Sequence, residues 1–333
     1  MRTVLLVAGT QVTTSDLHLL YERAFAAAGW RTVFLSHDSH LPFGEKIFQQ
    51  SRLRFSRPHV ALVNRRVRRL ARACSPDLVF ISGSNWYVSP DTIRSLQHAG
   101  ARVVLNEQHL QVFRSWQAAC LPLYDHVFVQ DGGLAALLRA AAPVRGASLL
   151  GPACDPREHR PVALSEDQRR ALGAEVAYLG YAYPNRLAMM EALHDFDVRL
   201  WGVGWDAAPA LAARVRREPV HGLKKTLVYN ATAVNLNLQS HQYQLDGVTC
   251  RPFEVAACGA FCLTEPRRDL AAFFRAGEEM VTFDGLDDLR AKIRHYLAHP
   301  DERRAIAARA RERALGEHTY GHRVQQVLST VGL

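Results

Sequence analysis

The chain has 333 residues, of which 48% are hydrophobic and 22% charged, and its formal net charge is +9. This composition excludes a disordered chain, and no apolar run reaches the roughly 18 residues of a membrane-spanning helix. At roughly 100–200 residues per domain, the length predicts two domains.

Short apolar runs alternate with helix-like stretches through the first half of the chain. We predict strands at residues 3–8, 31–38, 77–82, 102–107 and 126–131, with helices between them. Runs of Val, Ile, Leu and Phe that are separated by helices indicate a parallel sheet in α/β layers. The first strand is preferred to a secretion signal because polar residues follow it at once, so we expect a cytoplasmic protein.

The alternation pauses at residues 151–173, where prolines, glycines and charges indicate a linker or crossover, and then restarts. We predict strands at 175–181, 197–204, 218–223, 232–238, 259–265 and 280–284, and helices at 185–194, 207–217 and 252–258. From Asp287 to about Val331 the sequence favours helix, because Ala, Glu and Arg are strong helix formers. The fold class is therefore α/β, with two doubly wound domains at 1–155 and 156–333.

The most informative segment is DGVTCRPFEVAACGAFCLTE, residues 246–265. Seven residues separate Asp246 from Glu254, and the predicted helix places Glu254 in its first turn. A carboxylate there accepts from sugar or ribose hydroxyls, while Arg251 and the first amides of the helix favour phosphate oxygens. A capping carboxylate on an ordinary surface helix is the structural alternative.

Several further pieces stand in a fixed order: YLGYAYPNR, LWGVGWD, VHG, VYNATAVNLNL and RPFEVAACGAFCLTE. With them, residues 176–325 resemble the nucleotide-sugar domain of group 1 glycosyltransferases, and more closely their CgeB-like (spore maturation protein) branch. The resemblance implies a GT-B fold, in which two Rossmann-like domains face an interdomain cleft and the second holds the donor. It also allows the final helix to pack back on the first domain.

The resemblance implies roles for three positions. Glu254 matches the second glutamate of a Glu–seven residues–Glu motif, which holds the donor ribose, and Asp246 stands where the first glutamate contacts the transferred sugar. The shorter aspartate departs from the motif. Arg186 falls where the family places a basic residue near the diphosphate.

The expected reaction moves a sugar from a nucleoside diphosphate, with UDP favoured, to an acceptor hydroxyl. Arg186 and Arg251 would stabilise the leaving diphosphate. We predict transfer without a metal or other cofactor, because fixed cations such as these arginines can replace Mg²⁺ at the leaving group, with retention of anomeric configuration as a weaker expectation. The alternative is a GT-B-like module that binds a nucleotide or glycan without turnover.

Other donor-side candidates are less specific. They are Gly202, Gly204, Trp205, His221, Gly222, Lys224 and Asn237. The glycines permit close approach of the backbone to a ligand, and the tryptophan could line a nucleotide pocket. A tight turn, solvated lysines at a helix start and satisfied strand amides are the corresponding structural alternatives.

The acceptor side of the site is less clear. His18, just beyond the first strand, is a candidate base, and Glu107 ends the predicted strand at 102–107. His18 lies between Leu17 and Leu19, so a structural role is the stronger alternative for it.

Most of the positive charge lies in the first domain. Residues 1–155 hold 17 Lys+Arg and 10 Asp+Glu, and eight arginines fall within Arg52–Arg72. This stretch predicts either peripheral contact with an anionic membrane or acidic polymer, or a solvated helix face. Nucleic-acid binding is not expected, because no recognition motif is present. The six cysteines predict neither a disulfide framework nor, from Cys/His spacing, a zinc site.

Overall fold

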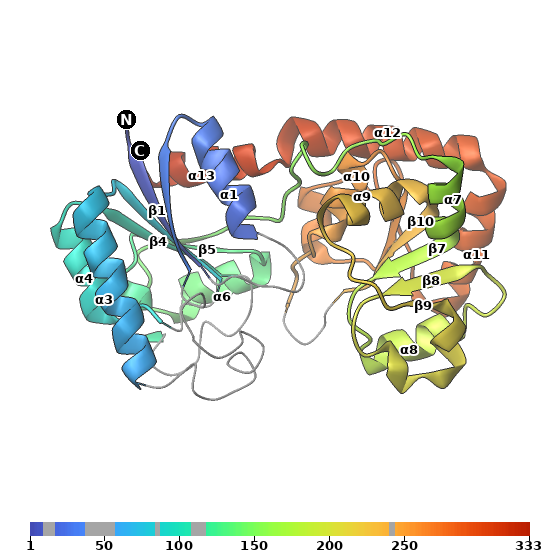
Figure 1. Ribbon diagram of the computed structural model, residues 1–333, viewed down its shortest axis with the longest axis horizontal. Helices are drawn as coiled ribbons and strands as arrows, with labels where there is room; N and C mark the ends of the chain where they lie inside the picture. The colour runs from blue at the N-terminus through green and yellow to red at the C-terminus, as the bar shows by residue number, and fades with distance from the viewer. Residues whose placement is uncertain (9–16, 37–56, 84–86, 108–117, 240–243) are drawn as a thin grey trace. The chain divides into compact units, whose positions relative to one another are not determined.

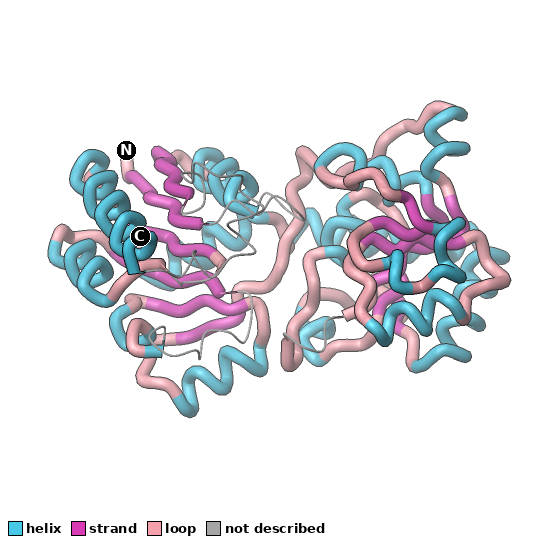
Figure 2. The backbone as a smooth tube through the Cα atoms, turned by 60° about the horizontal axis from the view of Figure 1, so that its bottom comes forward, coloured by secondary structure: helices cyan, strands magenta, loops and turns pink. Residues whose placement is uncertain are grey.

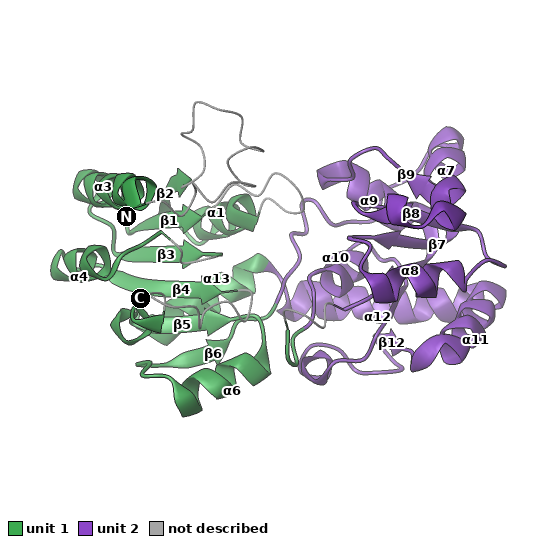
Figure 3. Cartoon of the chain, turned by 90° about the horizontal axis from the view of Figure 1, so that it is seen from below, with its two compact units in different colours: residues 1–151, 241–247, 320–333 green, residues 152–240, 248–319 purple. Residues whose placement is uncertain are grey.

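The computed structural model describes all residues except 9–16, 37–56, 84–86, 108–117 and 240–243. The chain divides into two compact units, each drawn in its own colour in Figure 3. Unit 1 comprises residues 1–151, 241–247 and 320–333, and unit 2 comprises residues 152–240 and 248–319. The sequence places the boundary slightly later, at 155, and assigns the segment 241–247 to the other domain.

Unit 1 is built on a six-stranded parallel sheet with the strand order β2-β1-β3-β4-β5-β6. The strands are β1 (Thr3–Ala8), β2 (Arg31–Ser36), β3 (Leu78–Ser82), β4 (Arg102–Glu107), β5 (His126–Val129) and β6 (Ala147–Leu149). The helices are α1 (Leu17–Ala27), α3 (Arg57–Cys74), α4 (Pro90–His98), α6 (Gly132–Ala141) and α13 (Tyr320–Val331). Figures 1 and 2 show helices on both faces of this sheet.

An aromatic cluster explains why the last helix belongs to unit 1. Tyr21 of α1 packs edge-on against Tyr320 of α13, with ring centroids 5.2 Å apart, and it also contacts Phe80 of β3. The guanidinium of Arg323 on α13 donates to the carbonyl of Gly151 at 2.8 Å. Because these contacts are buried, α13 completes the core of a unit whose sheet ends at residue 149.

Unit 2 carries a second parallel sheet, with the strand order β12-β11-β10-β7-β8-β9. Its strands are β7 (Ala174–Leu179), β8 (Val198–Trp201), β9 (Val215–Arg216), β10 (Thr232–Asn237), β11 (Cys262–Thr264) and β12 (Val281–Thr282). Its helices are α7 (Glu166–Leu172), α8 (Pro184–Glu191), α9 (Gly222–Ala231), α10 (Arg251–Ala257), α11 (Gly285–Ala298) and α12 (Pro300–Glu317).

Two predicted elements of unit 2 are wrong. The helix expected at 207–217 is a short 3-10 helix, Pro209–Arg214, followed by β9, because only Leu211 of that segment is buried and no apolar face forms. The strand expected at 218–223 is a loop leading into α9, since Pro219 cannot donate to a ladder and the segment is mostly exposed.

Candidate functional site

The winding of the second sheet reverses between β7 and β10, which are neighbours in space but not along the chain. From β7 the strands proceed outward through β8 and β9, and from β10 they proceed the other way through β11 and β12. Open parallel sheets bind ligands at such a switch point, beyond the carboxyl ends of the strands. In this unit that point lies beside Leu179 and Asn237.

Arg251 bridges the two strand ends at the switch point. Its Nη1 donates to Oδ1 of Asn237 at 2.7 Å, and its Nη2 donates to the carbonyl of Leu179. The amide nitrogen of Asn237 donates to Oγ1 of Thr264 at 2.8 Å, which leaves the amide oxygen for Arg251. The predicted donor residue Asn237 is fully buried, so its role here is to orient the guanidinium of Arg251.

Arg186 makes a second bridge between the same strand ends. It donates to three backbone carbonyls, those of Tyr181, Leu238 and Gln239, at 2.9–3.0 Å. The guanidinium carbons of Arg186 and Arg251 lie 5.5 and 4.9 Å from the ring centroid of Tyr178. The structure thus brings both predicted diphosphate arginines to one aromatic ring.

The two arginines are held by carbonyl and amide oxygens. Among the contacts of the described residues, neither guanidinium donates a hydrogen bond to a carboxylate, and the Nε of each is buried without a hydrogen-bond partner. Burial lowers the pKa of Arg186, and the positive charge of Arg251 lowers it further. An anion placed against the pair would offset the cost of holding these charges out of water.

Glu254 lies in the first turn of α10, as the sequence predicts, and is 3% exposed. Its Oε1 accepts from Nζ of Lys225 at 2.7 Å, and its Oε2 accepts from the hydroxyl of Tyr229 at 3.0 Å. Lys225 and Tyr229 are four residues apart on α9, so they project from the same face of that helix. Each carboxylate oxygen retains capacity for a second donor, such as a ribose hydroxyl.

His159 is the third neighbour of Glu254. Its Nε2 lies 3.8 Å from Oε1, and its Nδ1 accepts from the backbone N–H of Asp155 at 3.1 Å, which places the ring proton on Nε2. Burial by itself would raise the pKa of Glu254, but Lys225 and His159 outweigh it and lower that pKa to about 2. Glu254 is therefore an ionised acceptor at neutral pH.

The first amides of α10 do not form the phosphate site that the sequence predicts. The backbone N–H groups of Phe253 and Glu254 both donate to the carbonyl of Cys250 at 3.1 Å, and Pro252 has no N–H. Because these donors are used within the chain, the side chain of Arg251 is the cationic group that remains at this helix start.

The loop after β8 lies at the surface, with Gly202, Val203 and Gly204 exposed, whereas the adjoining Trp205 is buried. Gly202 and Gly204 have φ values of +130° and +93°, and a Cβ on Gly202 would overlap the carbonyl of Gly180. Trp205 is 1% exposed, and its Nε1 donates to that same carbonyl at 3.1 Å. The prediction that Trp205 lines a nucleotide pocket is wrong, because its ring fills the core. The glycines allow the β7 and β8 loops to meet.

At the start of α9, the lysine that contacts Glu254 is Lys225, one residue after the predicted Lys224. His221 and Gly222 are exposed, and the Nζ of Lys224 lies 3.6 Å from the carboxylate of Glu218 at the surface. The neighbouring Lys225 is instead the buried partner of Glu254. The four-residue spacing of Lys225 and Tyr229 on one helix face was the available signal for this pair.

Asp246 is held within unit 1. Oδ2 of Asp131 accepts from the backbone N–H groups of Leu245, Asp246 and Gly247 at 2.6, 3.1 and 3.0 Å. Oδ1 of Asp131 caps α6 by accepting from the N–H of Leu134 at 2.9 Å. The two members of the predicted Asp246–Glu254 motif therefore lie in different units, and sequence reasoning missed Asp131, the residue that anchors the first of them.

The acceptor-side candidates occupy the first unit. The ring of His18 on α1 stacks on Phe34 with centroids 4.6 Å apart, as the structural alternative expects. Glu107 ends β4 and is 3% exposed, so its carboxylate lies at the carboxyl edge of the sheet, where ligands of such folds bind.

The arginine-rich stretch is described from residue 57 onward, so Arg52 and Arg54 lie outside the described residues. α3 buries His59, Val63, Asn64, Val67 and Ala71, while Arg57, Arg65, Arg69 and Arg72 are exposed. In the part of the chain that the structure describes, no helix is both long enough and apolar enough to cross a membrane.

Comparison of the sequence with known families and curated proteins finds two matches. Residues 186–329 match a family model described as glycosyl transferase-like. Over 174 residues, the chain is 29% identical to the spore protein CgeB of Bacillus subtilis. That alignment covers 44% of this chain and 53% of the relative, so the chain spans about half the length of the curated relative it matches.

Three solved structures share the architecture of the whole chain. Sucrose-phosphate synthase from Thermosynechococcus elongatus has a TM-score of 0.71 at 14% identity, covering 99% of this chain and 98% of that one. A glycosyltransferase from Rickettsia africae has a TM-score of 0.69 at 9% identity, covering 99% and 97%. HepE of Anabaena in complex with UDP and glucose has a TM-score of 0.66 at 12% identity, covering all of both chains. At these identities the likeness shows the fold, which is GT-B.

Proposed function

We propose that this chain, whose residues 186–329 form a glycosyl transferase-like domain within a GT-B fold, transfers a sugar from a nucleoside diphosphate to an acceptor hydroxyl. The observation that carries the proposal is the arginine pair, Arg186 and Arg251, at the switch point between β7 and β10. A buried and a partly buried guanidinium, neither hydrogen-bonded to a carboxylate, suit a diphosphate, on which negative charge builds up during transfer.

Each proposed role follows from the chemistry of its side chain. Departure of the nucleoside diphosphate leaves negative charge, which Arg186 and Arg251 would stabilise. The ionised Glu254 would accept from the ribose hydroxyls, and Asp246 would contact the transferred sugar. A general base is needed only if transfer inverts the anomeric configuration, and Glu107, with His18 as the alternative, would then receive the proton of the acceptor hydroxyl. The structure of HepE with UDP supports UDP as the first donor nucleotide to test.

Two finer features belong to the same proposal. The fixed guanidinium pair supplies positive charge at the leaving group, so we propose transfer that does not depend on a divalent metal. We also propose retention of anomeric configuration, on the strength of the Asp246–Glu254 spacing. Transfer in excess chelator and NMR analysis of the anomeric product measure these two features separately.

Replacing Arg251 by lysine is expected to weaken UDP binding by about ten- to a hundredfold, the range for losing a hydrogen bond to a charged group. Lysine keeps the charge but cannot bridge Asn237, Leu179 and a phosphate at once. Arg214→Lys is the matched control, because Arg214 also donates to backbone carbonyls in unit 2, at Met190, Leu193 and His194. Calorimetric titration of UDP into both variants makes the measurement.

Release of UDP from UDP-sugars distinguishes an enzyme from a binding module. We expect the unaltered chain to release UDP slowly without an acceptor, and Glu254→Gln to reduce both UDP affinity and release. UDP binding without any release of UDP, in the presence or absence of acceptors, would favour the module. Equal UDP affinity in Arg251→Lys, Arg214→Lys and the unaltered chain would refute the proposed site.

We also propose peripheral contact of α3 with anionic membranes, which its exposed arginines support. The chain is expected to sediment with phosphatidylserine vesicles at low salt and to lose most of this binding near 0.5 M salt, where screening is strong. Neutral phosphatidylcholine vesicles are the control. Vesicle binding that does not change with salt concentration, or that is equal for the two vesicle types, would contradict the proposal.

A further inference from the structure

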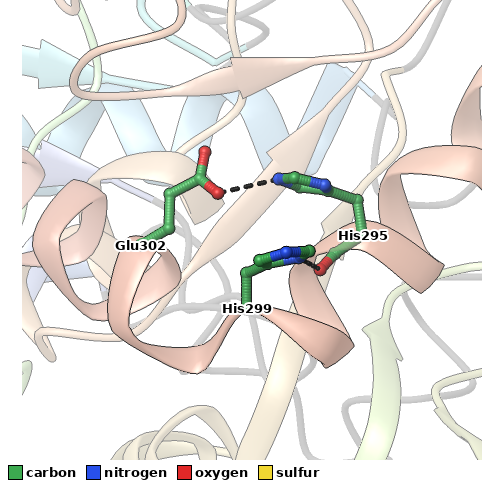
Figure 4. A group of neighbouring side chains, drawn as sticks. All are labelled: His295, His299 and Glu302. Carbon is green, nitrogen blue, oxygen red and sulfur yellow. Dashed lines mark hydrogen bonds and ion pairs between the residues drawn. The ribbon is translucent and has the colours of Figure 1, made fainter.

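Three metal-ligating side chains meet where α11 passes into α12. His295 lies in the last turn of α11, His299 precedes Pro300 at the start of α12, and Glu302 is in the first turn of α12 (Figure 4). One ligand atom from each lies within 4.8 Å of the other two. The three residues stand at i, i+4 and i+7, the spacing of one helix face, and helical backbone hydrogen bonds continue from His299 to His295 and from Arg303 to His299 across Pro300.

The backbone at this junction is held by further contacts. The ring of Tyr296 packs at a tilt against Phe261 with centroids 4.5 Å apart, which anchors the end of α11 in the core of unit 2. Arg303 of α12 donates from its side chain to the carbonyl of Tyr296 and from its backbone N–H to that of His299 at 3.1 Å. The three candidate ligands therefore project from a rigid helix junction, although their side chains reach solvent.

The side-chain contacts are also those of a metal site. Nε2 of His295 lies 2.7 Å from Oε2 of Glu302, and the rings of His295 and His299 stack with centroids 4.2 Å apart. A tetrahedral ion with bonds of about 2.0–2.1 Å separates its ligands by about 3.3 Å. Small rotations of these half-exposed side chains would therefore admit an ion between them.

The orientation of His299 is already set for coordination. Its Nδ1 lies 2.7 Å from the carbonyl of His295, and that contact requires Nδ1 to carry the ring proton. Nε2 of the neutral ring is then the lone-pair nitrogen. A ligand histidine that donates its other N–H to a backbone carbonyl is the usual arrangement around protein-bound metals.

We propose that His295, His299 and Glu302 bind a divalent first-row transition-metal ion, of which Zn²⁺ is the representative. Two imidazoles and one carboxylate suit Zn²⁺, with solvent in the fourth position, whereas Mg²⁺ and Ca²⁺ prefer oxygen ligands. The bound ion would join α11 to α12 and raise the thermal stability of unit 2.

This site is separate from the proposed donor site. The C-terminal end of α12 packs near α10, where the ring of His318 lies 5.6 Å from that of Phe253, the neighbour of Glu254. The candidate ligands lie at the opposite end of this 18-residue helix, which is about 27 Å long. The ion is therefore assigned a structural role, and transfer without a metal at the donor site is unaffected by it.

Calorimetric titration of the full chain with Zn²⁺ tests the proposal. We expect one ion per chain at this site, a loss of affinity of at least about tenfold in His299→Ala and in Glu302→Gln, and a rise in melting temperature with Zn²⁺ that both variants lack. His98→Ala is the matched control, because Nδ1 of His98 makes the same contact with the carbonyl four residues earlier, at 2.7 Å, on another exposed helix end.

Co²⁺ provides a second readout that identifies the ligands. Nitrogen and oxygen ligation gives weak visible bands of tetrahedral cobalt, whereas binding to the free cysteines gives sulfur charge-transfer absorption. Visible bands that disappear in His299→Ala and persist in His98→Ala support the site. Absence of Zn²⁺ binding, equal affinity in all variants, or a purely sulfur-ligated Co²⁺ spectrum would overturn it.

Discussion

Replacing Lys225 by methionine is expected to destabilise unit 2 by about 3–5 kcal/mol near neutral pH. Lys225 is the charged partner of Glu254, whose side chain is 4% exposed, and removing one member of a buried ion pair leaves the other charge uncompensated. Urea unfolding followed by the fluorescence of Trp201 and Trp205, both buried in unit 2, measures the change in the free energy of unfolding.

Two further variants make this result specific. Lys224→Met removes the adjacent lysine, whose contact with Glu218 is a surface pair at 3.6 Å, and should change stability by no more than about 0.5 kcal/mol. The double variant Lys225→Met/Glu254→Gln should recover much of the loss, because it leaves no unpaired charge. Equal effects of Lys224→Met and Lys225→Met would contradict the pairing.

The dependence of the free energy of unfolding on pH below about 4.5 tests the same interaction. The pKa of Glu254 falls from its ordinary 4.5 to about 2 in the folded chain, so its contribution is fully present above pH 4.5 and disappears as the pH falls to about 2. A shift of this size corresponds to about 3 kcal/mol. In Lys225→Met the largest contribution that lowers the pKa of Glu254 is lost, so that pKa should rise toward its ordinary value and the loss of stability between pH 4.5 and 2 should shrink.

Replacing Asp131 by alanine is expected to destabilise unit 1 by at least about 3 kcal/mol. The loss of a helix cap costs about 1 kcal/mol, and three backbone N–H groups at Leu245, Asp246 and Gly247 lose their acceptor at the same time. Hydrogen exchange at these amides is the direct measurement, since their protection should fall further than that of the β-strand core.

The control for Asp131 is another aspartate at a helix start. Asp284 occupies the N-cap position of α11, but its side chain makes no capping hydrogen bond and is exposed, so Asp284→Ala should cost no more than about 0.5 kcal/mol. If Asp246 contacts the transferred sugar, Asp131→Ala should also reduce UDP release. Unchanged exchange at residues 245–247 would show that Asp131 does not hold this segment.

The sequence predicted the parts of this protein that depend on local pattern. Val, Ile and Leu runs located most strands of both sheets but missed the short strands β6 and β9, and the first-turn position of Glu254 followed from the Pro252 start of its helix. Arg251 came from its position at the start of that helix and Arg186 from the family resemblance, and the structure places both at the same switch point. Trp205 was misplaced because an aromatic residue after a strand has the same local pattern whether it lines a pocket or fills the core.

The pairings between distant residues were decided only by the tertiary structure. Hydrophobic periodicity specifies which face of an element is buried, but not which element will cover it, because that depends on strand order and crossover. The sequence alone therefore established two α/β halves and one carboxylate at a helix start. The tertiary structure determined that Lys225 pairs with that carboxylate and that Asp131 accepts hydrogen bonds from the backbone at residues 245–247. It also determined that α13 packs against α1.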